Sequence, residues 1–211
     1  MRILTVPVGP LQANCYLVAD DGGIALAIDP GGEPERLISA LEREGMRLTH
    51  ILLTHGHFDH LAGAAGLAEL TGARIACSEG TAPMLRNPDD YIPFPGFGGI
   101  PSREPDVLLA DGDIISVGQL EVETVTTPGH SPGDVTFAVD GALFCGDLLF
   151  YRSVGRTDLP GGDFDMLLQS VRRLVDRFPG ESRVYPGHMQ PTSLRDEVRA
   201  NPFLSGLSSR G

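Results

Sequence analysis

Residues 55–60 read His55-Gly-His57-Phe-Asp59-His60 and directly follow a short apolar run at 50–54 that the pattern predicts to be a strand. Residues two positions apart at a strand end point to the same side, so His55 and His57 can hold one metal ion together. Asp59 and His60 fall in the turn toward the next helix, where they can face a neighbouring position. The run therefore indicates a site for one or two metal ions.

Three later residues occur in similar surroundings, each in a predicted turn that follows a strand. They are His130 in Thr-Pro-Gly-His-Ser-Pro-Gly-Asp, Asp147 in Phe-Cys-Gly-Asp and His188 in Tyr-Pro-Gly-His. Glycine permits tight turns, and proline stiffens a loop before any ligand binds. Imidazole and carboxylate groups without cysteine favour Zn²⁺, iron or Mn²⁺ over a thiolate-rich structural zinc site.

Strand and helix patterns divide the chain into two halves with the same organisation. Each half has a β-meander followed by helices, which predicts an α/β fold in which two sheets pack face to face between outer helices, a four-layer αββα sandwich. The predicted strands are 3–8, 15–19, 24–28, 50–54, 74–78, 113–117, 120–126, 135–139, 142–145 and 183–185, and the predicted helices are 33–44, 61–70, 81–85, 163–178 and 191–199. We expect one domain over 1–205, a long loop at 87–105 and a disordered tail at 206–211.

Composition narrows the classes of function. Acidic residues outnumber basic ones 28 to 16 and the net charge is −12, which disfavours nucleic acid and anionic membranes as partners. All 16 cations are arginine, so a Schiff-base lysine is excluded. Three cysteines without metal-type spacing, and no signal peptide or membrane-length apolar run, predict a cytoplasmic protein.

The motif H-x-H-x-D-H with the later His, Asp and His resembles the metallo-β-lactamase superfamily over nearly the whole chain. Leu11-Gln-Ala-Asn-Cys-Tyr and Asp29-Pro-Gly are similar to the glyoxalase II branch, the hydroxyacylglutathione hydrolases and their short bacterial relatives. The resemblance implies two metal ions, with zinc favoured and iron or manganese as alternatives. It assigns the ligands as follows: His55, His57 and His130 on the first ion, Asp59, His60 and His188 on the second, and Asp147 bridging both.

A binuclear hydrolase of this kind uses a metal-bridged hydroxide, formed because two ions lower the pKa of a shared water from ~15.7 towards ~7. The hydroxide is expected to attack the carbonyl of a small-molecule thioester or ester, while Asp59 orients it or carries its proton. The resemblance also implies that Arg156, nine residues after Asp147, contacts substrate at the position of a basic glutathione-binding residue. A glutathione-linked thioester is one option for the substrate.

The glutathione pocket of the family is incomplete in this sequence. Asp158 and Gln190 stand where the family has tyrosines, and the chain ends 23 residues after His188, where longer relatives continue into a helical domain. The tetrapeptide Gly155–Asp158 is also similar to the persulfide dioxygenases, which use one iron, and this is the main alternative function. A non-catalytic metal-binding module is the alternative from another class.

Several residues also have structural interpretations. We expect His50 to be a strand-start residue, Cys145 a buried hydrophobe, and Asp29 a turn cap in preference to a support for a metal ligand. The side chain of Arg156 can pair with Asp147 or Asp158 as readily as with substrate. The aromatic residues of the 87–105 loop can pack on the protein surface or form a lid.

Overall fold

The computed structural model describes residues 1–205, and the strands of this part form two six-stranded sheets and one small hairpin. The tail predicted at 206–211 lies outside the described residues. The first sheet has the order β1-β2-β3-β4-β5-β6, antiparallel from β1 to β3 and parallel from β3 to β6. Its strands are β1 (Arg2–Val8), β2 (Ala13–Ala19), β3 (Ile24–Ile28), β4 (Arg47–Leu52), β5 (Arg74–Ser78) and β6 (Val107–Leu109).

The second sheet has the order β14-β13-β10-β9-β8-β7, and its single parallel pair among the described residues joins β10 to β13. Its strands are β7 (Ile114–Val117), β8 (Leu120–Thr126), β9 (Val135–Val139), β10 (Ala142–Gly146), β13 (Arg183–Pro186) and β14 (Thr192–Ser193). The hairpin pairs β11 (Leu149–Phe150) with β12 (Ser153–Val154).

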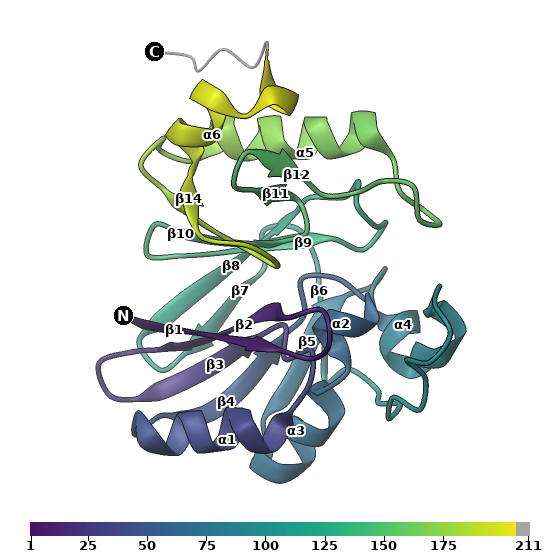
Figure 1. Cartoon of the computed structure of the whole chain (residues 1–211). Coiled ribbons are helices and arrows are strands. Elements are labelled where there is room, and N and C mark those ends of the chain that lie inside the picture. The colour runs from purple at the N-terminus through teal and green to yellow at the C-terminus, as the bar shows by residue number, and fades with distance from the viewer. Residues whose placement is uncertain (206–211) are drawn as a thin grey trace.

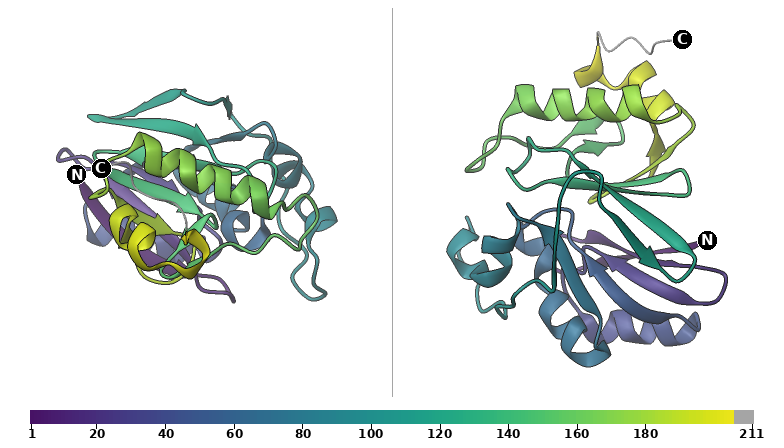
Figure 2. Two further views of the ribbon diagram at one scale, coloured as in Figure 1. Left: turned by 90° about the horizontal axis from the view of Figure 1, so that it is seen from above. Right: turned by 180° about the vertical axis from the view of Figure 1, so that it is seen from behind.

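Helices cover the outer face of each sheet (Figures 1 and 2). The first sheet carries α1 and α3 and the second carries α5 and α6, so the four layers predicted from the sequence are confirmed. The α-helices are α1 (Pro34–Arg43), α2 (Phe58–Leu61), α3 (Ala64–Thr71), α4 (Ala82–Arg86), α5 (Phe164–Arg177) and α6 (Leu194–Ala200), and the short 3₁₀ helices are η1 (Pro88–Tyr91) and η2 (Pro202–Leu204). None of the helices in residues 1–205 is long and apolar enough to cross a membrane.

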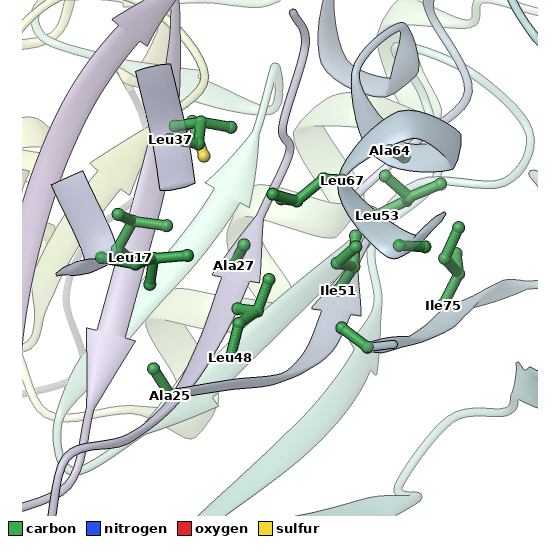
Figure 3. Packing of buried hydrophobic residues seen from close by; sticks show 14 of the residues in the cluster. Leu17, Ala25, Ala27, Leu37, Leu48, Ile51, Leu53, Ala64, Leu67 and Ile75 are labelled. Atoms are coloured by element: carbon green, nitrogen blue, oxygen red, sulfur yellow. The ribbon is translucent and has the colours of Figure 1, made fainter. Parts of the chain in front are cut away.

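Three clusters of buried apolar side chains fill the three spaces between the four layers. Alternation along each strand supplies two of them at once: on β3, Ala27 faces the helices whereas Leu26 and Ile28 face the second sheet. Figure 3 shows the helix side of the first sheet, where Leu37 of α1 and Leu67 of α3 pack over the strands.

The predicted helix at 61–70 is wrong in its extent, because the chain breaks there into α2 and α3. The amide of Gly63 leaves the helical pattern and donates to the carbonyl oxygen of Pro30 at 2.9 Å. A Cβ atom on Gly63 would lie 2.7 Å from that oxygen, so glycine permits the contact. The break lets α2 turn separately and places Asp59 and His60 against the loop that follows β3.

Short elements also differ from the sequence prediction. The predicted helix at 191–199 begins with strand β14, and α6 starts at Leu194, where the side chain of Ser193 caps it by accepting from the amide of Asp196. Strands β6, β11 and β12 were not predicted, since runs of two or three residues carry no periodic signal. His50 lies inside β4 and not at its start, because the strand begins at Arg47.

Candidate metal centre

Loops from both sheets meet at one end of the sandwich and bring together all seven predicted ligands. The ligands come from the four segments that follow the strands β4, β8, β10 and β13. The segment after β4 carries four of the ligands, two in the loop and two in α2, and the loops after β8, β10 and β13 carry one each. The ligands, in chain order, are His55, His57, Asp59, His60, His130, Asp147 and His188.

A first group consists of three imidazoles, from His55, His57 and His130, whose nitrogen atoms lie within 4.8 Å of one another. His130 Nε2 lies 2.8 Å from His57 Nδ1, and its other ring nitrogen lies 2.7 Å from the carbonyl oxygen of Arg156. That carbonyl fixes the ring orientation and leaves Nε2 facing the group. The group therefore offers three nitrogen ligands from two loops.

A second group consists of Asp59, His60 and His188, again with ligand atoms within 4.8 Å of one another. Asp59 Oδ2 lies 3.1 Å from His188 Nε2 and 3.5 Å from His60 Nε2. This group mixes one carboxylate with two imidazoles.

The carboxylate of Asp147 lies between the two groups. Its Oδ2 atom is 3.7 Å from His130 Nε2 in the first group and 3.8 Å from His188 Nε2 in the second. Its Oδ1 atom is 3.4 Å from His60 Nε2. One side chain thus faces both sets of nitrogen atoms.

Unpaired polar atoms at the centre fit a bound cation. Within residues 1–205, His55 Nε2, His60 Nε2 and Asp147 Oδ1 are buried and have no hydrogen-bond partner. Buried polar atoms are normally paired, so three unpaired atoms aimed at one place need a partner. Metal ions bound by the two groups would accept these lone pairs, and nitrogen with carboxylate oxygen is the donor set that zinc, iron and manganese take.

Electrostatics at the centre also favour a cation. Burial, reinforced by the neighbouring His130, lowers the pKa of His57 to about 4, which keeps its imidazole neutral and able to ligate. Burial alone would lower the pKa of His60 as well, but the carboxylates of Asp59, Asp147 and Asp29 outweigh it and raise that pKa to about 10. Positive charge at His60 Nε2 is therefore stabilised, whether a proton or a metal ion supplies it.

Asp29 was predicted to cap a turn, and the structure instead places it behind the ligands. Its carboxylate lies 3.0 Å from His60 Nδ1 and accepts hydrogen bonds from the amide and hydroxyl of Thr54, at 2.7 and 2.5 Å. The Thr54 hydroxyl also lies 3.0 Å from His55 Nδ1. One clue in the sequence was that Asp29, like Asp147, directly follows an apolar strand.

The structure also tests the other structural interpretations. Cys145 is buried, as predicted. The side chain of Arg156 pairs with Asp158, which confirms one of its two predicted ion-pair partners. In the 87–105 loop, the Phe97 ring packs on Phe58 with centroids 4.9 Å apart, which confirms packing on the protein's own surface, whereas Phe94 lines a cavity in front of the centre.

Comparison with known proteins identifies the family of the chain. Residues 8–188 match the metallo-beta-lactamase superfamily. Over 213 residues the chain is 36% identical to hydroxyacylglutathione hydrolase GloC of Haemophilus influenzae, with 99% of this chain and 100% of that protein covered.

Two solved structures are also similar. The BLEG-1 B3 metallo-beta-lactamase has a TM-score of 0.91 at 34% identity, over 97% of this chain and 100% of that one. TTHA1623 in a di-iron-bound form has a TM-score of 0.81 at 39% identity, over 95% and 100%. On the family match and on these identities, the chain belongs to the metallo-beta-lactamase superfamily.

Proposed function

We propose that the protein is a binuclear metallohydrolase that cleaves small-molecule thioesters. The observation that carries the proposal is the pair of ligand groups with Asp147 between them, because each group offers three protein ligands and a single carboxylate faces both. His55, His57 and His130 hold the first ion, and Asp59, His60 and His188 hold the second. Zinc is the favoured metal, with iron or manganese as alternatives.

When bound, two metal ions supply a water of lowered pKa as nucleophile and polarise the substrate carbonyl. The protein contributes orientation. Burial raises the pKa of Asp59, but the charge of His60 and the contact with His188 lower it overall, so the carboxylate stays ionised. Its Oδ atoms can accept a hydrogen bond from the attacking water and align it with the carbonyl.

The surroundings suit a thioester in two further respects. Half of the residues that line the cavity in front of the centre are apolar, which limits the contact of the reacting carbonyl with bulk water. A thiolate is a good leaving group, so the reaction needs little help from a general acid. The similarity to a protein named hydroxyacylglutathione hydrolase supports a thioester as the substrate.

The test combines metal content with hydrolysis. Protein purified without added metal is analysed for metal identity and stoichiometry, and the same sample is assayed with S-lactoylglutathione and with simple acyl thioesters. We expect two ions per chain and hydrolysis of at least one thioester. His188→Ala is expected to lose one of the two ions, whereas His50→Ala, which alters the histidine outside both groups, keeps both.

One iron per chain together with no thioester hydrolysis would overturn the proposal. Oxygen consumption with glutathione persulfide would then favour the dioxygenase alternative. Inactivity of fully metal-loaded protein on both esters and thioesters would instead favour a binding role without catalysis.

A further inference from the structure

The cavity in front of the metal centre is small and mostly apolar, with a volume of about 290 Å³. Half of its lining comes from the centre and from Arg156. The remaining lining residues are apolar and come from the β1–β2 turn, α2, the β11–β12 hairpin, the loop before α5 and the 87–105 loop: Leu11, Phe58, Pro93, Phe94, Phe150 and Leu159. Such a wall favours an aliphatic or aromatic group of the substrate over a charged one.

Arg156 is the one permanently charged cation among the described residues that line this cavity. Its Nε and Nη2 atoms donate to the two oxygens of Asp158, at 2.6 and 2.8 Å. This two-point contact occupies the side of the guanidinium best suited to a second carboxylate. A substrate carboxylate is therefore left with the end of the guanidinium and lies close to the negative charge of Asp158.

The pair remains charged on both sides at ordinary pH. The hydrogen bond from Arg156 holds the pKa of Asp158 at about 2, below its usual range, so the carboxylate is ionised throughout neutral conditions. The net charge of the pair is zero. The net charge of −12 over the whole chain further disfavours the approach of anions.

We propose that Asp158 cancels the charge of Arg156, so that the site selects thioesters whose group beside Arg156 is apolar and uncharged over those that carry a carboxylate there. This inference rests on the proposed thioesterase function and names the substrate class of that site. Arg156 then serves as a neutralised part of the wall and not as an anchor for anionic thiols such as glutathione.

The experiment compares two substrates that share one acyl group, a thioester of glutathione and a thioester of N-acetylcysteamine, which has no charge. Asp158→Asn keeps the size of the side chain and removes its charge. The ratio of kcat/KM for the glutathione thioester to that for the neutral one is expected to rise about two- to fivefold, the effect of one solvent-exposed charge pair, because both side chains are more than half exposed. Adding Arg156→Ala to Asp158→Asn is expected to abolish the gain.

Glu181→Gln is the matched control. Glu181 forms an exposed ion pair with Arg195 and does not line the cavity, so its loss changes the net charge of the protein equally without affecting the site. Its substrate ratio should equal that of the wild type. A ratio unchanged in Asp158→Asn, or raised equally by Glu181→Gln, would overturn the inference.

A binding measurement separates this inference from the proposed function. Calorimetry with S-hexylglutathione, which joins an apolar tail to the glutathione carboxylates, is run on metal-loaded wild type and Asp158→Asn. Tighter binding to the variant supports the role of Asp158 even if no thioester is hydrolysed. Absence of hydrolysis would then reject the proposed function but not the role of Asp158. Equal affinity for both proteins rejects the role of Asp158 whatever the activity.

Discussion

At the scale of single residues, Asp29 connects the two ligand groups without belonging to the predicted ligand set. Its carboxylate contacts His60 Nδ1 directly and reaches His55 Nδ1 through the Thr54 hydroxyl. These contacts leave the Nε2 atom of each ring facing the centre. Asp29 adopts φ 52°, a left-handed conformation that non-glycine residues seldom take, which suggests that the surrounding contacts hold it in place.

Replacement Asp29→Asn is expected to weaken metal binding by roughly 10- to 100-fold, the usual effect of losing such a supporting carboxylate. Asp20→Asn is the matched control. Asp20 is equally buried, but it accepts from the amides of Ile24 at the start of β3 and of Gln119 in the β7–β8 turn, so its replacement should lower stability and leave metal affinity unchanged. Competition with a chromophoric chelator measures both affinities, and equal losses in the two variants would contradict the role of Asp29.

The sequence predicted the seven ligands because each is a chemically distinctive residue in a turn after a strand. It did not predict the role of Asp29, whose contact with His60 spans 31 positions. That contact exists because β3 and β4 lie side by side and parallel, which puts the residues after both strands at the same edge of the sheet. Strand pairing of this kind leaves no local pattern in a single sequence.

At the scale of elements, the segment after β12 packs its backbone closely against Asp147, which lies in the turn between β10 and the hairpin. A Cβ atom on Gly155 would lie 1.7 Å from the carbonyl oxygen of Asp147, so the chain after β12 passes directly against the residue between the two groups. The amide of Gly155 also donates to the carbonyl of Leu148 at 3.2 Å. The next residue, Arg156, supplies the carbonyl that orients His130.

Gly155→Ala is therefore expected to displace Asp147 and reduce bound metal below two ions per chain, with a loss of about 1–3 kcal/mol in the free energy of unfolding. Metal analysis and denaturant unfolding measure the two effects. Gly180→Ala is the control, since its Cβ would meet an Arg195 side-chain atom at an ordinary 3.4 Å. Full metal content in Gly155→Ala would show that Asp147 tolerates the shift.

The 87–105 loop contributes to the cavity through Phe94, whose side chain is 42% exposed. Tyr91, at 45%, belongs to the same loop but does not line the cavity. Phe94→Ala is expected to raise KM for a thioester with an apolar acyl group about tenfold, because an aromatic wall is lost, while kcat changes less. Tyr91→Ala should leave both constants unchanged, and an equal effect of the two substitutions would show that the loop acts through its overall order.

At the scale of the whole molecule, the centre joins the two sheets. The first sheet supplies the four ligands of the His55–His60 loop and the second supplies His130, Asp147 and His188. Direct contacts between the sheets reinforce this end, such as the Tyr16 hydroxyl donating to the Pro186 carbonyl at 2.6 Å and the Val135 amide donating to the Thr54 carbonyl at 2.8 Å. The shared core between the sheets supports the proposal that 1–205 is one domain.

The layered architecture could be predicted because strand and helix periodicities are local and each half of the chain has a β-meander followed by helices. The order of strands within each sheet could not, since β10 pairs with β13 across an intervening hairpin and helix. The sequence likewise left two ion-pair partners open for Arg156, Asp147 and Asp158, and in the structure Arg156 pairs with Asp158.

Because both ligand groups take residues from each sheet, metal ions should stabilise the folded protein as a whole. Ions that bind the folded chain at 100 times their Kd add about 2.7 kcal/mol per site, which corresponds to a shift in Tm of roughly 5–10 °C for a protein of this size. Removing both ions with a chelator is expected to lower Tm by roughly twice that amount, about 10–20 °C, measured by calorimetry at a fixed scan rate. Asp147→Ala, which weakens both groups, should show a much smaller shift on chelation. An unchanged Tm in the wild type would mean that the four loops are held by protein contacts alone.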